Sequence, residues 1–454
     1  MTRALLDVPR CLKVETSYVG PPRVLITPRT RRNAWADASP SGGTAAYRRQ
    51  AVLECLDTAA VLREYREPLE GETWLTPAAS ERRLLAQVNA IIALGPQALT
   101  QVAALSIDPE VPDPGRVFAV LLILGCVEGP DWLAQARDIF LAATLRNPAE
   151  AAAAVEALSL CPNPELAMDL APLLGHEQAR VRASTTRVLA FHGALSEDAW
   201  DDAIHDRDPS VVAAAACAPL RGYDRGVCER ALQPLLARRD AEALVRLAMR
   251  AGLGLRLGAA HDCAVRIVRS DHPYWGDAAN CLAMFGYLAD ASRIREVLAG
   301  AHPLEGVDAA VILGSIELVP DLLDLLARDD CTPEASIEIK QALAGITGLA
   351  FDTAPDAAES RRLWAQGASN FESRVRYRRG RPLSLESLLQ SLRAGPGSRD
   401  ARQRAYLEML AATESRVPRF SPYDFVGVQA ESLRRIEHWL ADLQSRRPTS
   451  TNLH

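Results

Sequence analysis

The fold is decided by one stretch of the sequence, which runs from His176 to Leu220 and reads HEQARVRASTTRVLAFHGALSEDAWDDAIHDRDPSVVAAAACAPL. Small apolar residues recur in it at helical spacing, and Gly193 and Asp208 separate the helical runs. Glycine suits the position just after a helix because it adopts the left-handed conformation without a Cβ clash. Aspartate before proline, as at Asp208, is typical of a helix start. The stretch therefore predicts short helices joined by tight turns.

Glycines recur at nearly constant intervals on both sides of this stretch. Eight of them follow helical runs at intervals of 30, 68, 29, 30, 34, 28 and 31 residues: Gly95, Gly125, Gly193, Gly222, Gly252, Gly286, Gly314 and Gly345. The interval of 68 equals two units if the helix before Cys161 ends in a Cys-Pro pair. A period of about 30 residues is typical of a solenoid of two-helix repeats, in which each repeat buries its apolar face against its neighbours. We therefore expect each of these glycines to end a helix.

Helix starts are expected to follow the same period. A capping side chain precedes proline at four places: Asn147-Pro148, Asn163-Pro164, Asp208-Pro209 and Thr332-Pro333. Glu150 stands three residues after Asn147, which predicts a capping box at that helix start.

The stretch from His176 to Leu220 resembles HEAT repeats, because Glu177 and Asp208 each precede a valine and an alanine-rich run. The resemblance implies an all-α fold, an armadillo-like α-solenoid of about eight or nine units. Three places together resemble an uncharacterised proteobacterial family of HEAT-like proteins: Leu53 to Arg66, Glu81 to Gly95, and Arg374 to Gly380 with Gln429 and Trp439. Arg63 stands where that family tends to carry an aromatic residue. Members are often encoded beside type VI secretion genes, which implies an accessory or adaptor role, and the family brings no catalytic residues.

The pattern divides the chain into five segments. They are an irregular basic N-terminal arm (1–43), an N-terminal helix and linker (44–79), the repeat solenoid (80–350), a helical C-terminal cap (351–445) and a disordered tail (446–454). Within the cap we expect helices from about Ser384 to Leu392, from Ser398 to Ala412 and from Ser421 to Leu443. Such a block would cover the apolar end of a solenoid.

Composition and charge exclude several classes of protein. The 454 residues are 48% hydrophobic and 24% charged, which is the balance of a globular chain. Aromatic residues make up only 5%, which disfavours β-sandwiches and barrels. Residues 1–50 hold nine basic and three acidic side chains, so they carry +6, and the remainder of the −6 chain carries −12. Because nucleic-acid affinity depends on many Lys and Arg contacts to phosphate, this acidic body predicts no nucleic-acid partner.

Cysteines and apolar runs indicate a cytoplasmic protein. The nine cysteines are dispersed and form no Cys-x-x-Cys motif, as expected for reduced core thiols. The longest apolar run, Val117 to Val127, is too short to span a bilayer, so we expect no membrane insertion. Arg3 and Asp7 interrupt any apolar core of a signal peptide.

No motif of catalysis is present in the sequence. It contains no nucleophile elbow, phosphate loop, dinucleotide fingerprint or His-Glu-x-x-His pattern, so we expect no enzyme activity, cofactor or metal site. Two groups leave weak alternatives for a metal: His261 to Cys263 with Asp271 and His272, and Asp201 to Asp206. Ordinary capping and solvated turns explain both groups.

An arginine cluster is the sharpest surface feature that the sequence predicts. Its members are Arg374, Arg376, Tyr377, Arg378, Arg379 and Arg381. Guanidinium groups this close repel unless they face solvent, acidic residues of the body or an anionic partner. Internal pairing and partner binding both remain open here, and we take these six residues as candidate partner-binding residues.

The sequence as a whole predicts a non-enzymatic scaffold or adaptor that binds a protein partner. An accessory role in a bacterial type VI secretion system rests on the family resemblance alone. The alternative is an enzyme on a HEAT-like scaffold, such as a chromophore lyase or a DNA-base glycosylase. A glycosylase would need a basic groove, which the acidic body disfavours.

Overall fold

The structure is a computed structural model, and the residues that it describes are almost entirely helical. They form twenty-two α-helices, five short 3-10 helices and two antiparallel pairs of two-residue strands, Leu12–Lys13 with Arg23–Val24 and Tyr377–Arg378 with Arg381–Pro382. The predicted all-α class is therefore confirmed. The described residues are 12–13, 23–24, 42–69, 71–105, 111–218, 220–239, 242–270, 275–300, 303–394 and 398–446. Most of the predicted basic arm and residues 447–454 of the predicted tail lie outside them.

Contacts divide the chain into two compact units. The first comprises Met1–Pro219, Gly395–Arg402 and Arg419–Arg435, and the second comprises Leu220–Ala394, Gln403–Pro418 and Ile436–His454. The predicted cap, residues 351–445, is thus divided between them. The predicted segment boundaries stay a prediction, because they follow the repeat pattern and the units follow contacts.

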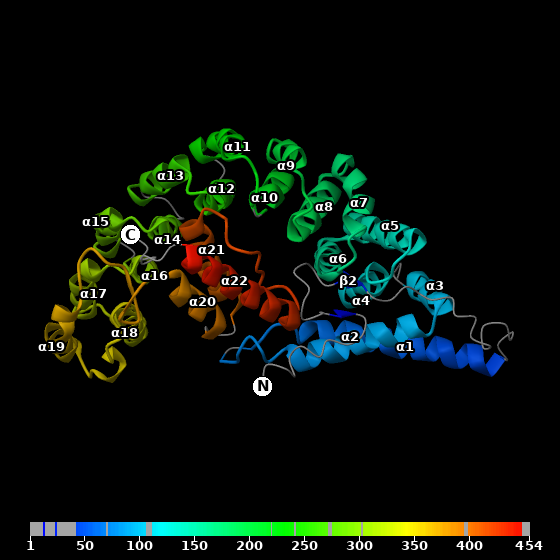
Figure 1. The fold of residues 1–454 in the computed structure, drawn as a ribbon, viewed down its shortest axis with the longest axis horizontal. Coiled ribbons are helices and arrows are strands. Elements are labelled where there is room, and N and C mark those ends of the chain that lie inside the picture. The colour runs from blue at the N-terminus through cyan, green and yellow to red at the C-terminus, as the bar shows by residue number, and fades with distance from the viewer. Residues whose placement is uncertain are drawn as a thin grey trace. The chain divides into compact units, whose positions relative to one another are not determined.

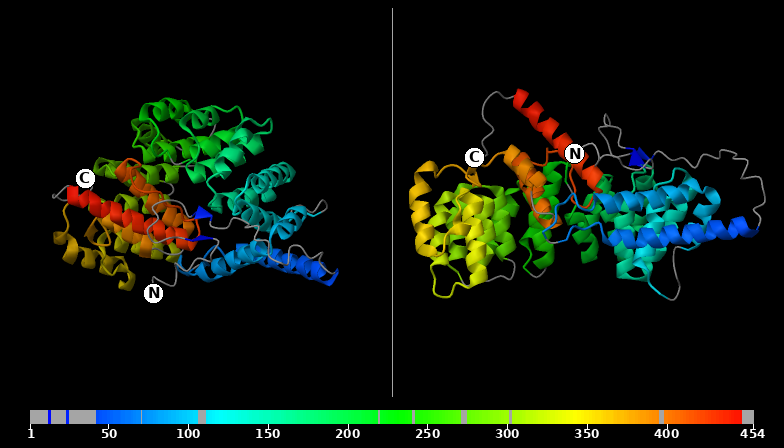
Figure 2. Two further views of the ribbon diagram at one scale, coloured as in Figure 1. Left: turned by 45° about the vertical axis from the view of Figure 1, so that its right-hand side comes forward. Right: turned by 90° about the horizontal axis from the view of Figure 1, so that it is seen from below.

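Helices of the first unit pack against their neighbours in two rows (Figure 1). Helices α1, α4, α6, α8 and α10 form one row, each packed against the next, and α3, α5 and α7 form the other. Helices α1 and α2 lie side by side (Figure 2). The bounds are α1 (Gly42–Glu64), α2 (Ala78–Ala93), α3 (Pro96–Ala104), α4 (Pro114–Gly125), α5 (Pro130–Arg146), α6 (Pro148–Leu160), α7 (Leu166–Leu170), α8 (Ala179–His192), α9 (Glu197–Ile204) and α10 (Pro209–Ala216).

The second unit repeats this arrangement. Helices α12, α14, α16 and α18 form one row, α11, α13, α15, α17 and α19 form the other, and successive helices of the two rows pair. The bounds are α11 (Arg225–Ala237), α12 (Glu242–Gly254), α13 (Gly258–Val268), α14 (Trp275–Phe285), α15 (Ala291–Leu298), α16 (Leu304–Leu313), α17 (Val319–Leu326), α18 (Pro333–Thr347), α19 (Ala357–Gly367) and α20 (Leu385–Ala394). Helices α21 (Arg399–Thr413) and α22 (Val426–Arg446) begin in the first unit and end in the second.

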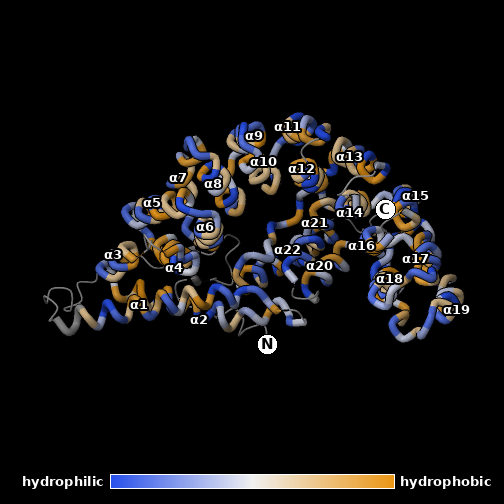
Figure 3. Tube along the Cα trace, turned by 180° about the vertical axis from the view of Figure 1, so that it is seen from behind, coloured by the Kyte–Doolittle hydropathy of each residue, from blue (hydrophilic) through white to orange (hydrophobic). Residues whose placement is uncertain are grey.

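The core forms where small and branched apolar side chains meet between the rows. Helix α4 is apolar on every side, and its residues from Val117 onward are buried among α1, α5 and α6 (Figure 3). On the shorter helix α9, Trp200 is fully buried, and its Nε1 donates to the Ala215 carbonyl at 3.0 Å. On α22, Leu433, Ile436 and Leu440 are buried.

Three of the four predicted helix starts are confirmed. Asn147, Asp208 and Thr332 each accept a hydrogen bond from a backbone N–H in the first turn of α6, α10 and α18. The fourth is wrong, because Asn163 caps a turn and α7 begins only at Leu166. The predicted capping box forms only one of its two hydrogen bonds, the one from the backbone N–H of Glu150 to Asn147. The Glu150 carboxylate accepts instead from the backbone N–H of Asp113 at 3.1 Å.

The last helix begins later than predicted. Ser421 and Pro422 precede a turn, in which the Ser421 hydroxyl accepts from the backbone N–H of Tyr423, and α22 starts at Val426. The two helices predicted before it agree with α20 and α21 within two residues at each end.

Four of the eight periodic glycines directly follow the end of a helix as predicted, and each has a positive φ: Gly95, Gly193, Gly286 and Gly314. Gly222 also has a positive φ, but it lies in the turn between α10 and α11, six residues after α10 ends. Gly125 is the last residue of α4, as predicted, but it has no positive φ. The prediction is wrong for Gly222, which does not end a helix, and for Gly252 and Gly345, which lie within helices. At Gly125 and Gly252 another residue packs closely against the helix. There the missing side chain permits close packing: a Cβ on Gly125 would lie 2.5 Å from Cys161 Sγ, and one on Gly252 would lie 2.6 Å from Ala260 Cβ. Helix α18 ends instead at Gly348, whose φ is 70°.

Candidate functional site

The predicted arginine cluster lies in a segment that we call the strap, residues 371–383 of the second unit. The strap crosses the C-terminal ends of α16 and α18, where helix carbonyls lack partners within the helix. The backbone N–H of Tyr377 donates to Gly314 O at 2.7 Å, and that of Arg379 donates to Gly345 O at 2.7 Å. The strap thereby joins the ends of two neighbouring helices of one row.

Arg376 adds a third helix to this junction. Its side chain is only 6% exposed, and its guanidinium donates to Leu313 O at 2.9 Å, Ile312 O at 3.0 Å and Ala283 O at 3.4 Å. These carbonyls belong to the last turns of α16 and α14, whose partial negative charge favours a cation. Burial lowers the pKa of Arg376 to about 10, so the side chain stays charged at neutral pH.

The prediction of partner-binding residues is therefore corrected at three positions. Arg376 and Tyr377 are buried, and Arg378 forms an ion pair with Glu408 at 3.0 Å. Internal pairing is the alternative that fits these side chains. Arg374, Arg379 and Arg381 remain exposed and available to a partner.

Positive-φ glycines make room for the strap. A Cβ on Gly286 would overlap the Arg376 guanidinium, and a Cβ on Gly314 would overlap the carbonyl oxygen of Tyr377. At Gly348 the Cβ would lie 2.6 Å from Arg379 O. The glycines at these helix ends therefore serve two purposes, turning the chain and admitting a second backbone.

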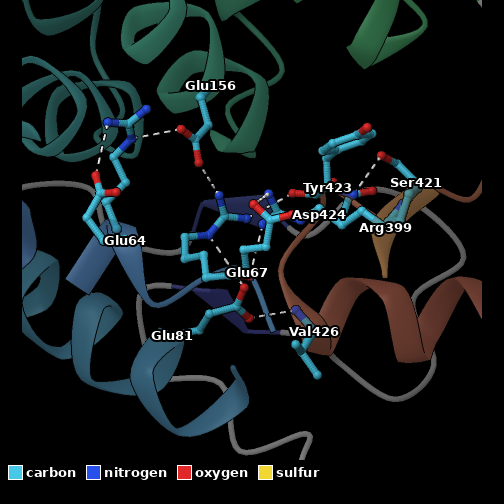
Figure 4. Close-up of polar contacts among 12 residues, drawn as sticks. Glu64, Glu67, Glu81, Glu156, Arg399, Ser421, Tyr423, Asp424 and Val426 are labelled. Carbon is cyan, nitrogen blue, oxygen red and sulfur yellow. Dashed lines mark hydrogen bonds and ion pairs between the residues drawn. The ribbon is translucent and has the colours of Figure 1, made fainter. Parts of the chain in front are cut away.

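A second cluster, which sequence analysis did not identify as a site, surrounds Arg66 in the first unit. We call it the Arg66 site (Figure 4). It encloses a cavity of about 340 Å³ whose lining comes from the end of α1, from α6, from the start of α21 and from the turn before α22. The lining residues are Arg63, Glu64, Arg66, Glu67, Glu156, Arg399 and Tyr423.

Arg66 is the centre of this site and is only 3% exposed. Its Nη1 contacts Glu156 Oε1 at 2.5 Å, and its Nε lies 3.5 Å from Glu81 Oε1. Its Nη2 donates to the Tyr423 carbonyl at 2.9 Å. The guanidinium also lies over the Phe425 ring, 5.0 Å from the centroid. One buried cation thus connects α1, α2, α6 and the turn before α22.

Glu81 is the buried carboxylate that pairs with Arg66, and it is 4% exposed. Its Oε2 accepts from the backbone N–H of Val426 at 2.6 Å. Burial raises the pKa of Glu81 to about 7, although the positive charge of Arg66 opposes the shift. A carboxyl group of this kind changes charge near neutral pH.

Arg399 stands at the rim of the cavity. Its Nη2 donates to the backbone carbonyl of Arg66 at 2.9 Å, and its guanidinium lies over the Tyr423 ring at 5.4 Å. Its nearest carboxylate, Glu67, is 3.7 Å away. Burial lowers the pKa of Arg399 and raises that of Tyr423.

The lining of the cavity consists of charged side chains and one phenol. Three guanidinium groups, three carboxylates and one phenol line the cavity, and this lining, as far as the structure describes it, holds no Ser, Cys, His or Lys. Guanidinium forks held in fixed positions match the carboxylates of a polypeptide. Nearby, Arg402 donates to Gln429 and lies over the Trp74 ring at 4.2 Å, which supports the same wall.

In the part of the chain that the structure describes, no three His, Cys, Asp or Glu side chains come close enough together to hold a metal ion. His261 Nε2 instead lies 2.9 Å from Asp290, while Asp271 and His272 lie outside the described residues. Across the described ranges, no helix has the length and apolar character that crossing a bilayer requires.

We expect the stability of the protein to fall as the pH rises from about 4.5 to about 7. The folded state binds the Glu81 proton more tightly than the unfolded chain does, and this tighter binding stabilises the fold. The stabilisation is complete at pH values below the unfolded pKa, and it is lost as the pH rises past the folded pKa. The difference between the unfolded and folded pKa of Glu81 corresponds to up to about 3 kcal/mol in the free energy of unfolding. Urea unfolding of wild type and Glu81→Gln across this range tests it.

The substitution Glu64→Gln is the matched control, because Glu64 lines the same cavity but its side chain is 74% exposed. The free energy of unfolding should fall equally steeply with pH in wild type and in the control, and it should fall less steeply in Glu81→Gln. Parallel slopes in all three proteins would exclude Glu81 as the titrating group.

Comparisons with known proteins give a likeness in structure. No protein-family model matches the sequence, and no curated protein matches it. The chain is similar to the X-ray structure of YibA from Escherichia coli, at 14% sequence identity and a TM-score of 0.29, over 58% of this chain and 87% of YibA. A likeness of this size assigns neither a family nor a function to the chain.

Proposed function

We propose that this protein is an α-solenoid of HEAT-like two-helix repeats and acts as a non-enzymatic, cytoplasmic scaffold that binds a protein. The two-row packing within each unit supports the repeat architecture, because each helical pair contacts the pairs before and after it. The accessory role in a bacterial type VI secretion system belongs to the proposal through the family resemblance of residues 53–66, 81–95 and 374–380.

The cavity of the Arg66 site is the observation that carries the proposal. Arg66 is fixed by Glu81 and Glu156, so its position needs no reorganisation when a ligand arrives. Arg399 and Tyr423 stand at the rim, where Tyr423 is 44% exposed. A cation and an aromatic ring side by side are typical of protein interfaces. A carboxylate of a partner polypeptide is the group that this rim fits best.

Co-purification with rim variants tests this function. Arg399→Gln removes the cation nearest to the opening, and Tyr423→Ala removes the exposed ring. Each should lower recovery of the protein partner about tenfold, since a charge-assisted hydrogen bond contributes about 1.5–3 kcal/mol and a central aromatic residue of an interface about 2 kcal/mol. Quantitative mass spectrometry of the eluates gives the recovery.

Arg83→Gln is the matched control, because Arg83 is exposed on α2 and lies outside the cavity lining. Melting temperatures of all variants separate lost binding from lost folding. Undiminished partner recovery with both folded rim variants would contradict the proposed role of the site.

A further inference from the structure

An apolar groove with an acidic edge crosses the second unit at the N-terminal halves of α16 and α18. It consists of two cavities, of about 370 and 450 Å³, that share Leu304 and Glu305 in their linings. We call it the α16 groove. The floor of the smaller cavity is apolar and comes from Leu325, Ala335 and Ile339.

Carboxylates from successive helices line the larger cavity. Asp277, Asp308 and Glu338 come from α14, α16 and α18 and recur at intervals of 31 and 30 residues, which is the repeat period of the glycines. Asp277 is paired with Arg250 at 2.9 Å, and Asp308 is paired with Arg404.

Two carboxylates of the groove remain available. Neither Glu305 nor Glu338 forms an ion pair with any residue that the structure describes. A Cβ on Gly276 would lie 2.8 Å from Glu305 Oε2, so this glycine gives the Glu305 side chain its place across α14. Burial and the charge of Asp308 raise the pKa of Glu338. A bound cation would favour the ionised form of this carboxylate by its charge.

We infer that the α16 groove binds a basic segment of a partner protein, in which Arg or Lys side chains flank an apolar residue. The apolar side chain enters the cavity floored by Leu325, Ala335 and Ile339, and the cations face Glu305 and Glu338. Charge complementarity selects this occupant, because four carboxylates line one cavity and two of them, Glu305 and Glu338, form no ion pair within the described residues. The inference rests on the proposed function and names the chemistry of a second binding surface.

Panning a phage library of random dodecapeptides on the full-length protein tests the inference. Enriched peptides should carry Arg or Lys on both sides of Leu, Ile, Met or Phe. Synthetic copies should bind about tenfold more weakly to Glu305→Gln/Glu338→Gln, as measured by fluorescence anisotropy, and more weakly as ionic strength rises. The control Glu296→Gln/Glu317→Gln removes two carboxylates that are exposed outside the groove and should bind like wild type.

The two binding surfaces give separate outcomes. Enrichment of acidic or uncharged peptides, or equal binding to wild type and the groove variant, would overturn the inference. Basic peptides should bind Arg399→Gln as tightly as wild type, because Arg399 belongs to the Arg66 site. If the peptide experiment fails, the co-purification test of the Arg66 site is therefore unaffected. If the co-purification test fails, the peptide experiment on the α16 groove is likewise unaffected.

Discussion

Replacing Arg376 with alanine is expected to lower the free energy of unfolding by about 3 kcal/mol or more. The substitution leaves the buried carbonyls of Ile312 and Leu313 without their donor and opens a cavity under the strap. It also removes the charge that complements the last turns of α14 and α16. Urea unfolding followed by circular dichroism measures the change.

Arg374 offers the control within the same strap, because its side chain is exposed. Arg374→Ala should change the free energy of unfolding by less than about 0.5 kcal/mol. A stable Arg376→Ala protein that has lost its partner would contradict the internal role of Arg376 and restore the partner-binding interpretation of the cluster.

Replacing Arg66 with alanine is expected to destabilise the protein by about 3–5 kcal/mol at neutral pH. Removal of this cation leaves Glu81 buried without its ion-pair partner and takes one guanidinium from Glu156. The loss should be smaller near pH 5, because Glu81 then takes up a proton and its charge disappears. Denaturant unfolding at both pH values measures the difference.

Combination with Glu81→Gln makes this prediction specific. The double variant should recover part of the stability that Arg66→Ala loses, because no uncompensated charge remains at position 81. Arg83→Ala, which removes an exposed arginine from the same region of α2, should leave stability within about 0.5 kcal/mol of wild type. Equal losses for Arg66→Ala and Arg83→Ala would contradict the ionic network.

Local chemistry allowed the helices to be predicted from the sequence. Asn147, Asp208 and Thr332 satisfy N–H groups one turn ahead, so their effect is visible within four residues of sequence. Gly252 was interpreted wrongly because glycine serves two purposes. A left-handed turn and a close helix contact both exclude a side chain, and only tertiary structure distinguishes them.

The candidate sites depend on residues that are distant in sequence. The hydrogen bond from Arg66 to Tyr423 spans 357 positions, and the one from Val426 to Glu81 spans 345. No periodicity links such positions, so the Arg66 site could not be assembled from the sequence. Arg376 was found as a charge cluster, but its burial follows from helix-end carbonyls that the sequence does not display.

The α16 groove did leave a signal that sequence analysis overlooked. Asp277, Asp308 and Glu338 recur with the repeat period, as residues at equivalent positions of stacked repeats would. A search for periodic acidic residues beside the periodic glycines would have found them.

Purification of the tagged full-length chain from its native host, with protein, nucleic acid and small molecules measured in one eluate, tests the central claim most directly. The scaffold account predicts a protein in constant ratio to the chain, whose recovery falls with Arg399→Gln or Glu305→Gln/Glu338→Gln and not with Arg83→Gln. Nucleic acid or a bound small molecule, recovered without any protein partner, would contradict it.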